Sequence, residues 1–281
     1  MSERFGERLR AALDARGPLC VGIDPHASLL GAWGLPDDAS GLREFGLRTV
    51  EAASGRVGIV KPQVSFFERF GSAGYAALEE VMAAARAADL LVIADAKRGD
   101  IGSTMDAYGA AWLTPGSPLE ADALTVNPFL GVGALDGALD VAHAHGKGLF
   151  VLAATSNPEA TTMQRSVSAT GRTVSADIVA VVSARNAMHA APGEWGSAGF
   201  VIGATVDWSD AGLAAFTPFA PILAPGFGSQ GAAPADLRHR FGSMSAAVIA
   251  SESRSILAAG PVGLADAIDA RVAEYREVDR G

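Results

Sequence analysis

Eight short apolar runs recur along the chain, and turn-forming residues bound each of them. The runs lie at residues 18–24, 57–62, 90–95, 122–127, 148–154, 199–205, 219–225 and 246–251. Each is almost continuously apolar rather than alternating with polar positions, which is typical of parallel strands buried on both faces. The pattern therefore predicts eight buried parallel strands.

Ala-rich stretches with helical spacing lie between these runs. Residues 71–88 place Tyr75, Leu78 and Met82 on one face, and residues 261–278 do the same with Leu264 and Ile268. Such periodicity predicts amphipathic helices that pack against the sheet. A further helix is predicted over residues 3–15, before the first strand.

Strands and helices that alternate about eight times indicate a (β/α)₈ TIM barrel. A doubly wound open sheet is the alternative that the pattern leaves open. No linker or change of composition divides the chain, so we expect one domain over residues 1–281, with residues 1–16 as an N-terminal helical extension.

The composition narrows the classes of function. Apolar residues make up 49% of the 281 residues, and the net charge is −9, which disfavours a nucleic-acid polymer as partner. The single cysteine, Cys20, cannot form an intrachain disulfide and fits a reducing compartment. The N-terminus lacks the apolar core of a signal peptide, and no apolar run is long enough to span a bilayer. We therefore expect a cytoplasmic protein without a membrane partner.

In a barrel, the active site forms where the strands end. Lys61 ends the second run, Asp95 ends the third, and Lys97 and Asp100 follow it. Asp95 and Lys97 are two residues apart and so face the same side of an extended chain. An ammonium group flanked by carboxylates suits a reaction that protonates a carbanion. A purely structural network of ion pairs at the barrel mouth is the alternative.

A Gly-rich segment, PGFGSQG at residues 225–231, follows the seventh run, and Arg254 follows the eighth. Backbone N–H groups and an arginine in these positions suit a phosphate group, although an ordinary glycine turn has the same composition. Glu252 is only two residues before Arg254, where a carboxylate is unfavourable unless its side chain points away. His26, near the mouth of the barrel, has no assigned role.

No dinucleotide-binding, Walker-type or metal-binding motif is evident. His143 and His145 are two residues apart on a predicted helix and so cannot share a face. Cys20 lies inside a strand, which favours a buried structural thiol over a nucleophile.

The segment DAKRGDIGST (95–104) resembles the DxKxxD motif of the orotidine 5′-phosphate decarboxylase suprafamily. Asp24, the VKPQ segment with Lys61, the PGFGSQG segment and Arg254-Ser255-Ile256 occur in the matching places after their strands. The segments FVLAATSNPE and LTVNPFLG are similar to the longer bacterial subgroup, often called type 2. The resemblance spans nearly the whole chain.

The resemblance implies decarboxylation of orotidine 5′-monophosphate to UMP and CO₂ in pyrimidine biosynthesis, without cofactor or metal. It assigns Lys97 as the proton donor to C6 of the pyrimidine and places Asp95 beside the scissile carboxylate. Lys61 would hold the array and contact the ribose. Asp24 would bind a ribose hydroxyl.

The resemblance also implies a homodimer. Asp100 would reach into the partner's site, with Ile101 and Thr104 beside it. Ser156 would contact the edge of the pyrimidine, and Gln230 and Arg254 would bind the phosphate.

Two alternatives differ in chemistry. The sugar-phosphate members of the suprafamily, 3-keto-L-gulonate 6-phosphate decarboxylase and hexulose-phosphate synthase, hold Mg²⁺ through a glutamate after the second strand. Lys61 stands at that point here and would repel a divalent cation. The other alternative is a barrel that binds nucleotides without turnover, for which a complete charged array has no evident use.

Overall fold

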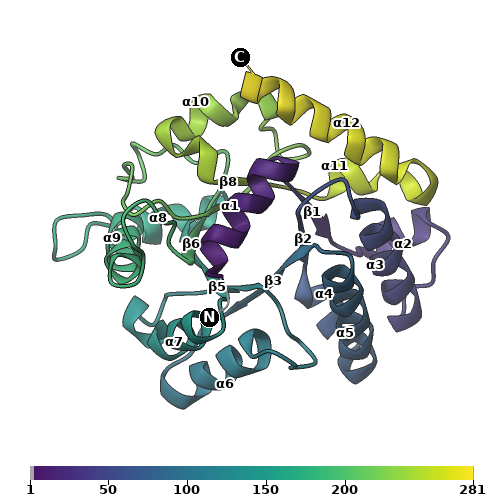
Figure 1. Cartoon of the computed structure of the whole chain (residues 1–281), viewed down its shortest axis with the longest axis horizontal. Helices are drawn as coiled ribbons and strands as arrows, with labels where there is room; N and C mark the ends of the chain where they lie inside the picture. The colour runs from purple at the N-terminus through teal and green to yellow at the C-terminus, as the bar shows by residue number, and fades with distance from the viewer. Residues whose placement is uncertain (1–2, 281) are drawn as a thin grey trace.

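Eight parallel strands close into one barrel, in the order of the sequence from β1 to β8, in a computed structural model that describes residues 3–280 (Figure 1). The strands are β1 (Leu19–Ile23), β2 (Ile59–Pro62), β3 (Leu91–Arg98), β4 (Ala123–Val126), β5 (Gly148–Ala154), β6 (Ala198–Ile202), β7 (Ile222–Pro225) and β8 (Val248–Glu252). The prediction of a single (β/α)₈ barrel is confirmed, and the open sheet is excluded because β8 pairs with β1. Residues 1, 2 and 281, which the predicted domain and its extension include, lie outside the described residues.

Helices lie around the barrel and at its two ends. They are α1 (Phe5–Arg16), α2 (Ala27–Ala32), α3 (Ala39–Ala53), α4 (Val64–Glu68), α5 (Gly71–Ala87), α6 (Gly102–Leu113), α7 (Asp136–Ala144), α8 (Thr161–Gln164), α9 (Val174–Ala187), α10 (Leu237–Phe241), α11 (Arg254–Leu257) and α12 (Gly260–Arg280). Four short 3₁₀ segments lie at residues 132–135, 158–160, 234–236 and 242–247. The predicted helices at 3–15, 71–88 and 261–278 correspond to α1, α5 and α12. No helix in the described part of the chain is long and apolar enough to cross a membrane.

The alternation of strands and helices is interrupted between β6 and β7. Residues 203–221 form no helix, because the Asp207 carboxylate accepts hydrogen bonds from Ser209 and from the backbone of Asp210 and so stabilises a turn. Pro218 and Pro221 follow and cannot continue a helix. The third strand also differs from the prediction, since β3 runs past Asp95 to Arg98.

The core has two parts. Side chains inside the barrel, among them Cys20, Ile59 and Phe150, pack against α1 through Phe5 and Leu9. A larger cluster fills the layer between the strands and the surrounding helices. The strands are thus buried on both faces, as their continuous apolar runs require.

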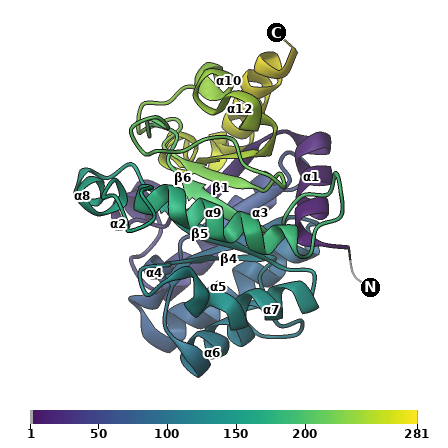
Figure 2. The same ribbon diagram turned by 90° about the vertical axis from the view of Figure 1, so that its left-hand side faces the viewer.

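Helix α1 lies across the N-terminal end of the barrel, and α2 and α8 lie at the opposite end (Figure 2). The ring of Phe5 on α1 meets that of Phe150 edge to face, with centroids 6.0 Å apart. Because α1 closes this end, the C-terminal ends of the strands form the open mouth.

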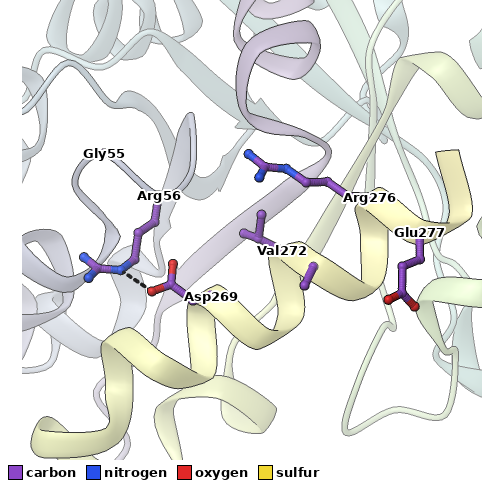
Figure 3. Close-up of a pocket in the computed structure, with 7 residues that line it drawn as sticks. Gly55, Arg56, Asp269, Val272, Arg276 and Glu277 are labelled. Carbon is purple, nitrogen blue, oxygen red and sulfur yellow. Dashed lines mark hydrogen bonds and ion pairs between the residues drawn. The ribbon is translucent and has the colours of Figure 1, made fainter. Parts of the chain in front are cut away.

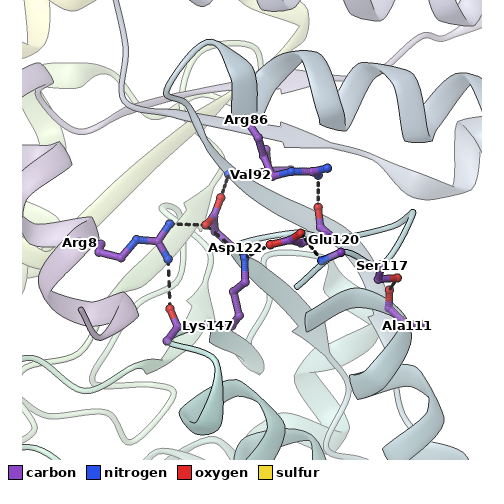
Figure 4. Close-up of polar contacts among 10 residues, drawn as sticks. Arg8, Arg86, Val92, Ala111, Ser117, Glu120, Asp122 and Lys147 are labelled. Carbon is purple, nitrogen blue, oxygen red and sulfur yellow. Dashed lines mark hydrogen bonds and ion pairs between the residues drawn. The ribbon is translucent and has the colours of Figure 1, made fainter. Parts of the chain in front are cut away.

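A buried polar network fixes α1 to the strands at the closed end (Figure 4). Asp122, directly before β4, accepts hydrogen bonds from the side chain of Arg8 on α1 and from the backbone N–H of Val92, the latter at 2.9 Å. The Lys147 ammonium lies 2.8 Å from Glu120 and 3.7 Å from Asp122. Asp122 and Lys147 are each buried, so every partner in the network is needed to offset their desolvation.

We predict that Asp122→Asn lowers the free energy of unfolding by about 2 kcal/mol, because Arg8 and Lys147 lose a charged partner. Urea-induced unfolding measures the loss. The exposed pair of Arg43 and Glu80 provides the control, where Glu80→Gln should cost less than about 1 kcal/mol. Equal effects of the two substitutions would contradict the role given to the network.

Candidate active site

A cavity of about 530 Å³ opens at the C-terminal ends of the strands. Seven residues predicted from the sequence line it, namely Asp24, Lys61, Asp95, Lys97, Ser156, Gln230 and Arg254. The strands β1, β2, β3, β5, β7 and β8 each deliver at least one of them at or just past its end. Position in the barrel therefore explains why residues distant in sequence meet here.

Asp95 is the centre of the charged array in this cavity. Its Oδ2 lies 3.0 Å from the Lys61 ammonium, and its Oδ1 lies 2.6 Å from the Lys97 ammonium. The side chains of Asp95 and Lys61 are 9% and 7% exposed, whereas that of Lys97 is 46% exposed. Lys61 is thus the buried counter-charge, and Lys97 is the member that a ligand can reach.

Burial and charge act in opposite directions on this pair. Burial alone would raise the pKa of Asp95, but Lys61 and Lys97 hold that pKa well below its usual range. Burial would likewise lower the pKa of Lys61, but the carboxylates of Asp95 and Asp24 raise it above its usual range. Both groups therefore stay charged at neutral pH.

Thr125 on β4 is a part of this arrangement that the sequence analysis missed. Its fully buried hydroxyl donates to Asp95 Oδ1 at 2.9 Å and accepts from the backbone N–H of Lys97 at 2.9 Å. Lys97 has a φ of 48°, a left-handed conformation that costs a non-glycine residue about 1–2 kcal/mol. The hydrogen bond from Lys97 N and the ion pair with Asp95 stabilise that conformation and point the ammonium into the cavity.

Gln63 is a second residue that the sequence analysis missed. Its side-chain Nε2 donates to the backbone carbonyl of Asp95 at 3.1 Å, and the residue lines the cavity. The signals for both were present, since Gln63 follows Lys61 at a strand end and Thr125 is a polar residue within an apolar run. His26 also lines the cavity, with its ring 4.3 Å from that of Phe66.

The opposite side of the cavity suits an anion. The loop after β7 contributes Gly226, Ser229 and Gln230, and α11 begins at Arg254. Among residues 3–280, Arg254 has no ion-pair partner, although its side chain is exposed at the cavity. A guanidinium that has no ion-pair partner among the described residues and lies at a cavity lined by a Gly-rich loop is suited to bind a phosphate or carboxylate.

Two polar atoms of the cavity residues are buried without a hydrogen-bond partner in the described structure. They are Oδ1 of Asp24 and the hydroxyl of Ser253. Buried polar atoms without a partner are costly and rare, so their position at a cavity indicates that a polar ligand completes them.

Three predicted residues do not line this cavity. Asp100 accepts a hydrogen bond from the backbone N–H of Ile101 at 2.8 Å and makes no ion pair within the described chain. Ile101 is 62% exposed, and Thr104 is exposed as well. The array in one chain therefore has three members, Lys61, Asp95 and Lys97, and Asp100 lies apart from it.

The structure also bears on Cys20, on a metal site and on the position of Glu252. Burial raises the pKa of the Cys20 thiol to about 12, so the thiol stays protonated at neutral pH, as expected of a structural cysteine. No cluster of three or more His, Cys, Asp or Glu side chains that could hold a metal ion occurs within residues 3–280. The Glu252 side chain points away from the cavity, which removes the conflict with a phosphate site.

A second hollow, on the outside of the barrel, does not compete with this site (Figure 3). It lies between the turn at Gly55 and Arg56 and helix α12, where the guanidinium of Arg56 is 3.0 Å from Asp269. The turn leads into the N-terminal end of β2, far from the strand ends that carry the charged array.

Comparisons with known proteins agree with the geometry. The family model described as Orotidine 5′-phosphate decarboxylase / HUMPS family matches residues 17–267. Proteins named orotidine 5′-phosphate decarboxylase from Salinispora arenicola and Streptomyces coelicolor are 54% and 53% identical over 259 and 262 residues, which is 92% of this chain and 91% of each relative.

Solved structures are similar along the whole chain. The crystal structure of a protein from Streptomyces avermitilis, assigned as an orotidine 5′-phosphate decarboxylase, has a TM-score of 0.94 and 50% identity, and the match covers 100% of this chain and 97% of that one. The OMP decarboxylase of Leishmania donovani matches with a TM-score of 0.78 and 26% identity, over 99% of both chains.

The charge state of Asp95 predicts how stability depends on pH. The pKa of Asp95 is lowered in the fold, whereas in the unfolded chain it is about 3.9. Its charge therefore stabilises the fold above about pH 4, and this contribution fades as pH falls toward the folded-state pKa. Asp95→Asn should lower the free energy of unfolding at pH 7, and the difference from wild type should be about 1 kcal/mol smaller at pH 3.

Denaturant unfolding at both pH values measures this change. Glu80→Gln, at an exposed carboxylate, is the matched control and should show little difference at either pH. A difference between Asp95→Asn and wild type that stays the same from pH 7 to pH 3 would show that the charge of Asp95 does not stabilise the fold.

Proposed function

The chain belongs to the Orotidine 5′-phosphate decarboxylase / HUMPS family, and we propose that this enzyme converts orotidine 5′-monophosphate to UMP and CO₂ in pyrimidine biosynthesis. One observation carries the proposal. One cavity holds an ammonium beside a carboxylate on one side and, beside a Gly-rich loop on the other, the Arg254 guanidinium, which has no ion-pair partner among residues 3–280. A ligand with a phosphate at one end and a reacting carboxylate at the other satisfies both sides.

The chemical step follows from the array. The bond between C6 of the pyrimidine and its carboxylate breaks, CO₂ leaves, and the electron pair remains on C6. Lys97 then donates a proton from Nζ to C6 and recovers one from water. Asp95 lies beside the position of the departing carboxylate, and Lys61 keeps Asp95 charged at that place.

Binding at the far end of the substrate supports this step. Arg254 and Gln230 bind the phosphate, which does not react, so binding free energy from that contact can hold the carboxylate next to Asp95. Asp24 accepts a hydrogen bond from a ribose hydroxyl through the oxygen that has no partner in the described structure. Ser156 contacts the edge of the pyrimidine.

We propose further that the enzyme is a homodimer in which Asp100 serves the partner's site. Asp100, Ile101 and Thr104 do not line the cavity of their own chain, and Ile101 exposes an apolar side chain. We take the surface around these residues as the contact with the second copy of the chain. Asp100 would add the fourth charge to an array that has three members in one protomer. A cytoplasmic location stays a prediction.

The residue at the end of the second strand argues against the Mg²⁺-dependent sugar-phosphate enzymes. Lys61 is buried at its end and bound to Asp95, so no carboxylate is available there for Mg²⁺. The relatives with more than half of their residues identical are named for the orotidine 5′-phosphate reaction. A barrel that binds nucleotides without turnover remains the second candidate, and the Lys97 experiment separates it from the enzyme.

Lys97→Ala should lower the rate of orotidine 5′-monophosphate decarboxylation at least about a thousand-fold, because the proton donor is lost. The decrease in ultraviolet absorbance of the substrate measures the rate, and circular dichroism checks folding. Arg43→Ala removes an exposed cation from another face and should leave the rate unchanged. Wild-type protein that binds UMP without turning over the substrate would overturn the enzyme proposal.

Mixing inactive Lys97→Ala and Asp100→Ala proteins tests the shared site. If Asp100 acts in the partner's site, a heterodimer has one site with both residues intact. Random exchange then restores about one quarter of the wild-type activity, since half of the dimers are mixed and half of their sites are complete.

Each variant mixed with itself is the control and should stay inactive. Native mass spectrometry confirms that mixed dimers form. Mixed dimers without activity would show that Asp100 acts within its own chain.

A further inference from the structure

Glu252 is a buried carboxylate that the decarboxylation step does not use. It is the last residue of β8, and its side chain is 0% exposed. Its neighbours Ser251 and Ser253 line the cavity, whereas Glu252 does not. Since successive side chains of a strand point to opposite faces, Glu252 lies in the layer between the barrel and its outer helices.

Both carboxylate oxygens of Glu252 have partners on the outer helices. Tyr275 of α12 donates to Oε1 at 2.8 Å, and Ser255 of α11 donates to Oε2 at 2.8 Å. The guanidinium of Arg271 on α12 lies 3.4 Å from Oε2 and balances the charge. Glu252 therefore connects α12 to the short helix that begins with Arg254.

The Gly-rich loop rests directly on this cluster. A Cβ atom at Gly228 would lie 2.5 Å from Glu252 Oε2 and 2.4 Å from Ser255 Oγ, so only glycine fits. The φ of 69° at Gly228 lies in the left-handed region and also favours glycine. The ring of Phe227, the preceding residue, meets the ring of Tyr275 edge to face, with centroids 5.9 Å apart.

These contacts join the two elements that form the anion side of the cavity. We propose that Glu252 is a positioning residue for the phosphate of the substrate: it holds the loop at Gly226–Gly231 and the start of α11 in register, so that Gln230 and Arg254 meet the same phosphate. This inference rests on the proposed function. It assigns a task to a carboxylate that would otherwise oppose an anion site.

A carboxylate suits this task because it accepts hydrogen bonds and donates none. Both hydroxyl groups, of Tyr275 and Ser255, must therefore act as donors toward it, which fixes one arrangement of the cluster. Without the carboxylate, those hydroxyls lose their acceptor in a buried layer, and Arg271 keeps only Glu274 as an ion-pair partner among the described residues. The loop and α11 are then free to move relative to each other.

The experiment compares UMP with uridine, which lacks the phosphate, by calorimetric titration of the full-length protein. Glu252→Ala should weaken UMP binding about ten-fold or more, while uridine binding changes less than about two-fold. Glu252→Gln keeps an acceptor and the shape, so it should recover part of the loss. Tyr275→Phe removes one hydrogen bond from outside the cavity and should give a smaller loss of the same kind. With orotidine 5′-monophosphate, KM should rise more than kcat falls.

Asp122→Asn is the matched control. It disturbs a buried carboxylate at the closed end of the barrel, so it should lower stability while leaving the ratio of UMP to uridine affinity unchanged. If Glu252→Ala does not fold, Glu252→Gln and Tyr275→Phe carry the test.

An unchanged ratio of UMP to uridine affinity in the folded variants would overturn the proposal and show that Glu252 only stabilises the fold. In that case wild-type protein still turns over orotidine 5′-monophosphate and prefers UMP, so the proposed function stands. Wild-type protein that neither turns over this substrate nor prefers UMP to uridine would overturn both.

Discussion

The site depends on one carboxylate, Asp95, which is held between two ammonium groups at the end of a buried strand. Any one of these charges alone would destabilise the apolar barrel, because removing an ion from water costs several kcal/mol. Lys61 offsets that cost from the neighbouring strand, and Thr125 adds a hydrogen bond from the strand on the other side. Lys97 can then remain at the cavity, held by Asp95 yet within reach of a ligand.

The residues that stabilise the fold and the residues that bind a ligand lie at opposite ends of the barrel. At the closed end, α1 and the network of Asp122 and Lys147 satisfy buried charges entirely within the protein. At the open end, a ligand can bind Arg254 and the oxygen of Asp24 that has no hydrogen-bond partner within residues 3–280. Glu252 resembles the closed-end charges in having all its partners inside the protein, but it lies directly behind the Gly-rich loop.

The sequence predicted the barrel because eight buried strands leave eight continuous apolar runs, and Asp95, Lys61 and Arg254 stood out as charges at the ends of those runs. It could not show that β3 continues through Lys97 in a left-handed conformation, since local propensity gives no such signal. Thr125 was missed because a single hydroxyl in an apolar strand acquires meaning only when the neighbouring strand is placed beside it. No helix forms between β6 and β7, although strands and helices alternate elsewhere, because turn-forming Asp207 and two prolines interrupt the chain there.

A crystal structure of the protein with UMP shows directly whether one ligand contacts both sides of the cavity. The proposed function predicts the phosphate within hydrogen-bond distance of Arg254 and the loop at Gly226–Gly231, and C6 of the pyrimidine facing Nζ of Lys97. A phosphate bound elsewhere, for example at the outer hollow beside Arg56, or a ring with C6 turned away from Lys97, would contradict it.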